Sequence, residues 1–190
     1  MSHLISYLFD HLIRYKKIIM SGVIALYVLY VIALSGFCVI SGINFYRNCE
    51  VYLKTAADAS TVKIAETELQ RAVSYIEKKG LTKGYTSIFF ETQDENVGFW
   101  YKNIKAALVE LKTLNSETTP LEASSVLIKI RETLLDHSGS GEEVTIPLGI
   151  SIYPYNGFVA FGIFISLIFG VISVWLFFIE RQRGGFDEQY

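Results

Sequence analysis

Two long apolar segments dominate the pattern of hydrophobic and polar positions along the chain. Residues 18–43 and residues 156–179 contain no Asp, Glu, Lys, Arg or His. A helix needs about 20 apolar residues to cross the hydrocarbon core of a bilayer, which is roughly 30 Å thick. Both segments meet this requirement. We therefore predict an integral membrane protein with two transmembrane helices.

Positive charges at the ends of these segments predict their orientation, because Lys and Arg close to a transmembrane helix are retained on the cytoplasmic side. Basic residues precede the first segment and follow the second: Arg14, Lys16, Lys17, Arg181 and Arg183. We expect residues 1–17 and 180–190 to be cytoplasmic. Residues 44–155 are then extracytoplasmic, in a periplasm or its equivalent, and the chain resides in the cell (inner or plasma) membrane.

The N-terminal region has the features of a retained signal anchor. The first apolar segment exceeds the roughly 7–15 residues of a cleaved signal peptide, and no A-x-A-like cleavage site follows it. Before it, residues 4–17 place apolar side chains on one helical face and polar ones on the other. This pattern fits a short amphipathic helix in the cytoplasmic interface. A simple extension of the first transmembrane helix fits equally well.

Small residues recur at helical spacing in both apolar segments. Such stripes let helices approach closely in a membrane. The predicted helix-packing residues are Gly22, Ala25, Ala33 and Gly36 in the first segment, and Gly162, Ser166 and Gly170 in the second. The two segments are expected to pack on each other, and packing on other subunits is the alternative.

The polar middle of the chain predicts helices. No Gly or Pro lies between residues 44 and 79, so the first transmembrane helix is expected to continue outward to Gly80. A second helix is expected from Thr92, with Glu95 completing a capping box. A third is expected from Thr119 to about Asp136, with Pro120 and Glu122 in its first turn.

The segment before the second apolar run has a different pattern. Residues 137–141 (His-Ser-Gly-Ser-Gly) indicate a flexible joint, and apolar residues alternate from 144 to 152, which indicates extended structure. Pro147 restricts this segment to an edge position, and residues 85–92 are a possible pairing partner. The predicted fold is an all-α membrane protein with two transmembrane helices, an extracytoplasmic three-helix domain and a small β-ribbon or extended return segment.

The most unusual local composition is the aromatic and acidic stretch from residue 89 to 101. It contains five residues that would form a partner-binding lip at the distal tip of the domain: Glu91, Asp94, Glu95, Phe99 and Trp100. The simpler interpretation is that the carboxylates favour a helix start and the aromatic residues belong to the core.

The remaining chemistry excludes several classes of function. Residues 44–155 hold 12 Lys and Arg against 15 Asp and Glu, so no basic surface for nucleic acid is present. No phosphate-binding loop, nucleophile elbow or metal motif occurs, and Asp136, His137, Glu142 and Glu143 match no known ligand spacing. Cys38 and Cys49 lie about 16 Å apart on one helix, too far to bridge. Cys49 is a free thiol or links two copies.

We therefore expect no enzyme activity, no cofactor and no metal. The leading hypothesis is a membrane accessory, scaffold or assembly subunit whose extracytoplasmic domain engages a protein partner. One alternative is a homo-oligomeric pore or lysis-type protein, in which the Gly162, Ser166 and Gly170 stripe lines a ring of copies. The other is an extracytoplasmic ligand-binding module.

Overall fold

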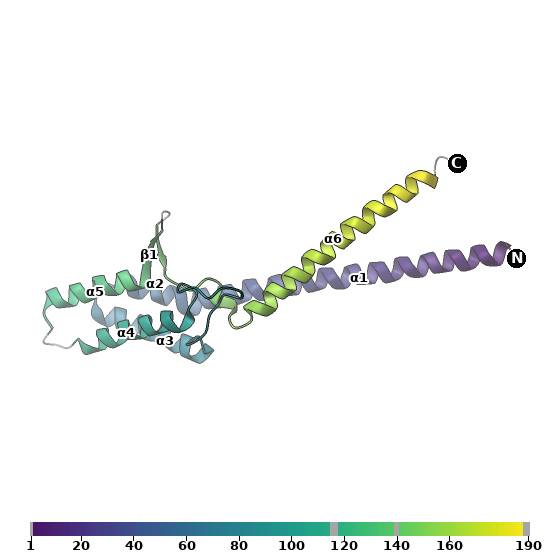
Figure 1. Ribbon diagram of the computed structural model, residues 1–190. Helices are drawn as coiled ribbons and strands as arrows, with labels where there is room; N and C mark the ends of the chain where they lie inside the picture. The colour runs from purple at the N-terminus through teal and green to yellow at the C-terminus, as the bar shows by residue number, and fades with distance from the viewer. Residues whose placement is uncertain (1, 115–117, 139–140, 188–190) are drawn as a thin grey trace. The chain divides into compact units, whose positions relative to one another are not determined.

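The computed structural model describes residues 2–114, 118–138 and 141–187, with side chains for residues 21–114, 118–136 and 141–175 (Figure 1). The chain forms two compact units. The first, which we call the helix pair, consists of residues 1–37 and 158–190. The second, which we call the helical domain, consists of residues 38–157. Each unit is described separately below.

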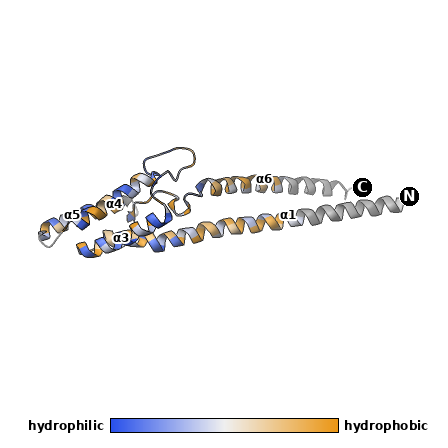
Figure 2. Cartoon of the chain, turned by 90° about the horizontal axis from the view of Figure 1, so that it is seen from below, coloured by the Kyte–Doolittle hydropathy of each residue, from blue (hydrophilic) through white to orange (hydrophobic). Residues whose placement is uncertain are grey.

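The helix pair is built from α1 (Ser2–Phe45) and α6 (Asn156–Asp187). Both are long and apolar enough to cross a membrane. Figure 2 shows hydrophobic colouring along their described parts, whereas the helices of the domain mix polar and apolar positions. Large apolar side chains of the pair are widely exposed, such as Leu26 at 70% and Leu167 at 64%. The length and composition of both helices therefore match the predicted transmembrane segments.

The N-terminal segment is part of the same helix as the first apolar segment, because α1 begins at Ser2. The side chains of residues 4–17, which carry the predicted amphipathic pattern, are not among those that the structure describes. Nor are the basic side chains at the expected cytoplasmic ends: Arg14, Lys16, Lys17, Arg181 and Arg183. The orientation predicted from them stays a prediction.

Among its described residues, the helical domain contains four α-helices after a π-helical turn. The turn η1 (Tyr46–Glu50) follows α1 directly and leads into α2 (Val51–Ala57). Then come α3 (Val62–Lys79), α4 (Val97–Thr113) and α5 (Pro120–Leu134). The chain continues through β1 (Leu135–Ser138), β2 (Gly141–Val144) and the 3-10 turn η2 (Ile150–Ile152).

The four helices enclose one apolar core. Contacts join α2 to α3, α3 to α4, α4 to α5 and α5 back to α2, so each helix lies between two others. One face of α3 lines this core, since Ala65, Leu69, Ala72 and Ile76 are fully buried. Further core side chains from the other elements include Cys49, Leu53, Val97, Leu111, Ile130 and Leu134.

The prediction of one uninterrupted helix to Lys79 is wrong. The helix ends at Ala57, the chain turns over residues 58–61, and α3 starts anew at Val62. The Thr61 side chain caps it by accepting a hydrogen bond from the amide of Ile64 at 3.3 Å. This turn lets α3 fold back on η1 and α2, so the domain has four helices instead of the expected three.

Two predicted helix ends are confirmed. Gly80 ends α3 in the left-handed conformation (φ 71°), which a residue without a Cβ adopts at no steric cost. Thr119 and Glu122 form the expected capping box at the start of α5, with Pro120 in the first turn.

The predicted start of the second helix at Thr92 is wrong by five residues. The Thr92 hydroxyl does bind the Glu95 carboxylate at 2.8 Å, but α4 begins at Val97 and is capped by Asn96. Backbone pairing explains the difference. The Thr86 amide donates to the Glu95 carbonyl at 3.0 Å and the Val97 amide to the Gly84 carbonyl at 2.9 Å, which holds Asn96 in an extended conformation opposite Tyr85.

The predicted partner of the extended segment is also wrong. Strand β2 pairs antiparallel with β1, from Leu135 opposite Val144 to Ser138 opposite Gly141, and not with residues 85–92. Of the predicted flexible joint, residues 137–138 and 141 belong to these two strands, and residues 139–140 lie outside the described residues. The alternating segment does not stay extended, because Gly149 takes a left-handed conformation (φ 76°) and starts the turn η2.

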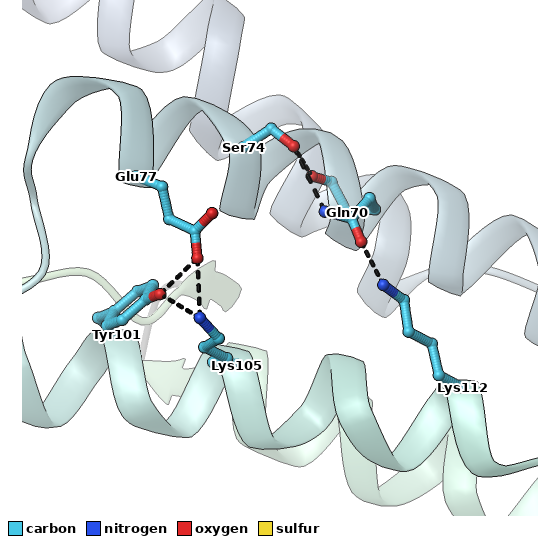
Figure 3. Close-up of polar contacts among 6 residues, drawn as sticks. All are labelled: Gln70, Ser74, Glu77, Tyr101, Lys105 and Lys112. Atoms are coloured by element: carbon cyan, nitrogen blue, oxygen red, sulfur yellow. Dashed lines mark hydrogen bonds and ion pairs between the residues drawn. The ribbon is translucent and has the colours of Figure 1, made fainter.

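Polar contacts on the surface join α3 to α4 (Figure 3). The Tyr101 hydroxyl donates to Glu77 at 2.5 Å, and the Lys105 ammonium donates to both groups at 2.8–2.9 Å. The hydrogen bonds from Tyr101 and Lys105 lower the pKa of the Glu77 carboxyl. Lys112 binds the Gln70 side chain further along the same pair of helices. Glu77, Lys105 and Lys112 are exposed, and Tyr101 and Gln70 are half-buried, so these contacts set the register of α3 against α4 more than they add stability.

The fold predicts a sharp difference between two apolar residues of α3. Leu69 is fully buried, whereas Ile64 is 45% exposed. We expect Leu69→Ala to lower the free energy of unfolding of the domain by about 2–5 kcal/mol, because it leaves a cavity in the core. Ile64→Ala, the matched control, should change it by less than about 1 kcal/mol. Urea unfolding in mild detergent, followed by circular dichroism, measures both; equal effects would contradict the assigned face of α3.

Candidate functional site

The helix directions place the aromatic and acidic stretch at one end of the helical domain. Two contacts show the direction of α3 relative to the preceding helices. The Arg71 guanidinium lies 5.7 Å from the centre of the Tyr52 ring, and four residues further on the Tyr75 ring lies 6.3 Å from the Phe45 ring. Residue numbers therefore rise along α3 while they fall along α2, η1 and the end of α1. Residues 80–96 consequently lie at the Phe45 end of the domain, where α1 enters it.

The chain also leaves the domain at this end. The Tyr153 hydroxyl donates to the Lys83 carbonyl at 3.0 Å, three residues before α6 begins. Gly84 allows this approach, since a Cβ there would lie 2.2 Å from the Tyr153 hydroxyl oxygen. The predicted location at a distal tip is therefore wrong. The stretch lies at the end of the domain that is linked to both apolar segments.

The five predicted partner-binding residues do not form one lip. Trp100 is only 6% exposed, and its indole N–H donates to the Thr145 carbonyl at 2.8 Å. It therefore belongs to the core, as the simpler interpretation proposed. Phe99 is 45% exposed, Glu91 and Asp94 are exposed, and Glu95 accepts hydrogen bonds inside its own loop. Whether these residues bind a partner stays a prediction.

A surface groove of about 720 Å³ lies elsewhere in the helical domain. One wall follows residues 42–55 through the end of α1, η1 and α2, a length of about 20 Å. The other wall is the chain from the end of β2 to η2. Its lining mixes charged and apolar side chains, among them Tyr46, Glu50, Lys54, Glu143, Ile146 and Leu148.

Negative charge prevails in this groove. Glu50, Glu142 and Glu143 line it against the single cation Lys54, counting the residues that border the groove. The Glu142 carboxylate accepts a hydrogen bond from Arg131, which also pairs with Asp58 at 3.4 Å. Glu50 and Glu143 therefore remain as the carboxylates nearest to a groove occupant. Sequence reasoning missed this groove, because residues 42–55 and 142–151 meet only in the folded domain.

The helix pair brings part of the predicted helix-packing residues into contact. Gly162 is buried against Tyr30, and a Cβ at this position would lie 2.3 Å from the Tyr30 hydroxyl oxygen. The Tyr27 hydroxyl donates to the Ser166 carbonyl at 3.0 Å, and its ring stacks on Phe169 at 5.9 Å. Gly162 and Ser166 of α6 therefore pack against tyrosines of α1. Tyr30 lies against Gly162, and the Tyr27 hydroxyl has a hydrogen-bond partner in the Ser166 carbonyl.

The other small residues lack such contacts within the described chain. No atom lies within 4 Å of a Cβ built at Gly22, Gly36 or Gly170, apart from their own helices. Ala25 and Ala33 are exposed. The stripe of α1 is thus directed away from α6, and the two stripes do not pack on each other.

Metal and thiol chemistry receive no support from the part of the chain that the structure describes. No group of three or more His, Cys, Asp or Glu side chains that could hold a metal ion occurs there. Cys49 is a fully buried member of the domain core, and Cys38 is half-buried on α1. Burial of Cys49 disfavours its predicted alternative role as a link between two copies. The His137 side chain lies outside the described residues.

Comparisons with protein-family models, with curated proteins and with solved structures give no match. The functional argument therefore rests on the residues and contacts described above.

The contact at Gly162 generates a prediction for the helix pair. We expect Gly162→Val to lower the stability of the pair by about 1–3 kcal/mol, because the added methyl groups displace Tyr30 and Leu34. Gly170→Val adds the same bulk to open space and should have little effect. Thermal unfolding of each purified variant in the same detergent measures the difference. An equal loss for both variants would show that the two helices do not pack through Gly162.

Proposed function

We propose that this chain is a two-pass membrane protein that acts as a non-enzymatic accessory, scaffold or assembly subunit. In this proposal α1 and α6 cross the cell membrane over residues 18–43 and 156–179. Both termini are cytoplasmic, and residues 44–155 are extracytoplasmic. The helical domain engages a protein partner.

The helix pair supports the membrane part of the proposal. Its helices expose large apolar side chains on nearly all sides, and burial of such surface in lipid is favourable by roughly 25 cal/mol per Å². Backbone polar groups are satisfied inside each helix, as a lipid environment requires. The basic residues that flank the two segments favour cytoplasmic termini.

The groove of the helical domain is the observation that carries the partner part. An elongated groove about 20 Å long suits an extended or helical peptide segment better than a compact molecule. Its apolar lining and the carboxylates Glu50 and Glu143 favour a segment that combines apolar side chains with positive charge. An extracytoplasmic ligand-binding module is the second candidate, because the volume also falls within the range of roughly 300–1,000 Å³ that is typical of small-molecule sites.

The pore alternative has weaker support. A ring of copies lined by Gly162 and Ser166 would need these residues to face other subunits. In the helix pair they lie against Tyr30 and Tyr27 of the same chain. The small residues that stay open, Gly22 and Gly36, leave room instead for a transmembrane helix of a partner.

Photo-crosslinking in the native membrane tests the partner proposal. A photoreactive amino acid replaces Thr55, an exposed residue that lines the groove, or Val109, which is 55% exposed on α4. We expect a discrete crosslinked product with another protein from position 55 and none from position 109. Glu143→Lys should abolish the product because it reverses a charge at the groove, whereas Glu132→Lys on α5 should leave it unchanged.

Three outcomes would contradict the partner proposal. The absence of any product from position 55 would remove its support, and equal products from both positions would show contact without use of the groove. A product with twice the mass of the chain would favour the homo-oligomer instead.

A further inference from the structure

The loop that joins α3 to α4 exposes an unusual run of apolar residues. Ile88 is 47% exposed, Phe89 85% and Phe90 82%. The base of the loop is closed by the backbone hydrogen bonds between residues 84–86 and 95–97, so the three side chains project from an ordered stem. Two adjacent phenylalanines with this exposure gain no hydrophobic free energy on folding, and such exposed apolar groups are typical of a surface that is covered by another apolar phase or molecule.

The position of the loop stem identifies what lies nearby. Lys83, next to the stem residue Gly84, accepts a hydrogen bond from Tyr153, and α6 begins at Asn156. Phe90 follows Gly84 by six residues, and an extended chain spans roughly 3.3 Å per residue. The tip of the loop therefore lies within about 20 Å of the stem. The stem itself is joined by a hydrogen bond to Tyr153, which lies three residues before the start of α6.

A second exposed apolar residue is tied to the same place. Leu148 is 82% exposed, and the carbonyl of the next residue, Gly149, accepts a hydrogen bond from the Asn156 side chain at 3.0 Å. Two separate segments, the α3–α4 loop and the chain before η2, thus expose apolar side chains, and each segment is joined by a hydrogen bond to the chain at or just before the start of α6.

We propose that the loop of residues 87–92 inserts Phe89 and Phe90 into the lipid interface of the membrane leaflet in which α6 begins. This inference rests on the proposed transmembrane role of α6. Aromatic side chains favour the interface between headgroups and acyl chains. The lysines Lys78, Lys79 and Lys83 lie at the same end of the domain as the loop carboxylates Glu91, Asp94 and Glu95, so the two signs of charge balance and the argument for lipid rests on the exposed aromatic side chains.

Lipid is a better occupant than a protein partner for a physical reason. Exposed aromatic side chains can enter a lipid interface without shape complementarity. The stem of the loop is also joined by the hydrogen bond from Tyr153 to Lys83 to the chain that leads into the apolar helix α6. The negative groove described above is lined by other elements, except for Leu148. The loop would thus hold the domain against the membrane surface, in addition to the chain connections from α1 and to α6.

Nitroxide spin labels on the full chain test the inference, with the protein in nanodiscs of phosphatidylcholine and phosphatidylglycerol. The background is Cys38→Ser, since Cys49 is buried. Labels are placed through Phe89→Cys and, separately, Phe90→Cys. Leu121→Cys, 79% exposed at the start of α5, is the matched control at the opposite end of the domain, and Ile168→Cys reports on α6. Collision with oxygen, relative to a water-soluble nickel chelate, measures lipid contact.

We expect the oxygen-to-nickel collision ratio at positions 89 and 90 to exceed that at 121 several-fold and to approach that at 168. A ratio at 89 and 90 equal to that at 121, with a high ratio at 168, would overturn the loop inference and leave the transmembrane proposal standing. Low ratios at all positions, 168 included, would overturn both. Because no partner protein is present in the nanodiscs, a high ratio at 89 and 90 cannot arise from one.

Discussion

The structure depends on a difference between its two units: the apolar side chains of the helix pair are largely exposed, whereas those of the helical domain are buried in a core. The side chains of α1 and α6 are apolar over most of their described length and remain exposed, whereas α2, α3, α4 and α5 bury their apolar faces in each other. A helix that is apolar all round is stable only where its surroundings are apolar too. The domain needs no such surroundings, because its core is complete within residues 38–157.

Several local features connect these two parts of the chain. The helix α1 runs without a break into the π-helical turn η1, whose Cys49 side chain belongs to the domain core. The hydrogen bond from Tyr153 to Lys83 ties the chain before α6 to the stem of the aromatic loop. Both connections and the stem of the aromatic loop consequently occur at the same end of the domain, where α1 ends and the chain leads into α6.

Features that depend on nearby residues were predictable from the sequence, and those that depend on long-range pairing were not. The apolar segments, the Gly80 helix end and the Thr119 capping box follow from local patterns and are present as predicted. The turn at residues 58–61 was missed because it contains no Gly or Pro, although Asp58, Ser60 and Thr61 together are typical of a helix break. The start of α4 depends on the hydrogen bond to the Gly84 carbonyl, and β2 depends on its pairing with β1, neither of which periodicity reveals. The same limit applies to the candidate sites, since the groove walls and the position of the aromatic loop arise only from the folding of α3 back on α2.

The central claim is that lipid is the solvent of α1 and α6, and flotation of cell membranes tests it most directly. Membranes from cells that produce the chain are washed with alkaline carbonate, which strips peripheral proteins, and are then centrifuged upward through a density gradient. The account predicts that the chain floats with the lipid after the wash. Recovery of the chain in the wash, or at the bottom of the gradient apart from lipid, would contradict it.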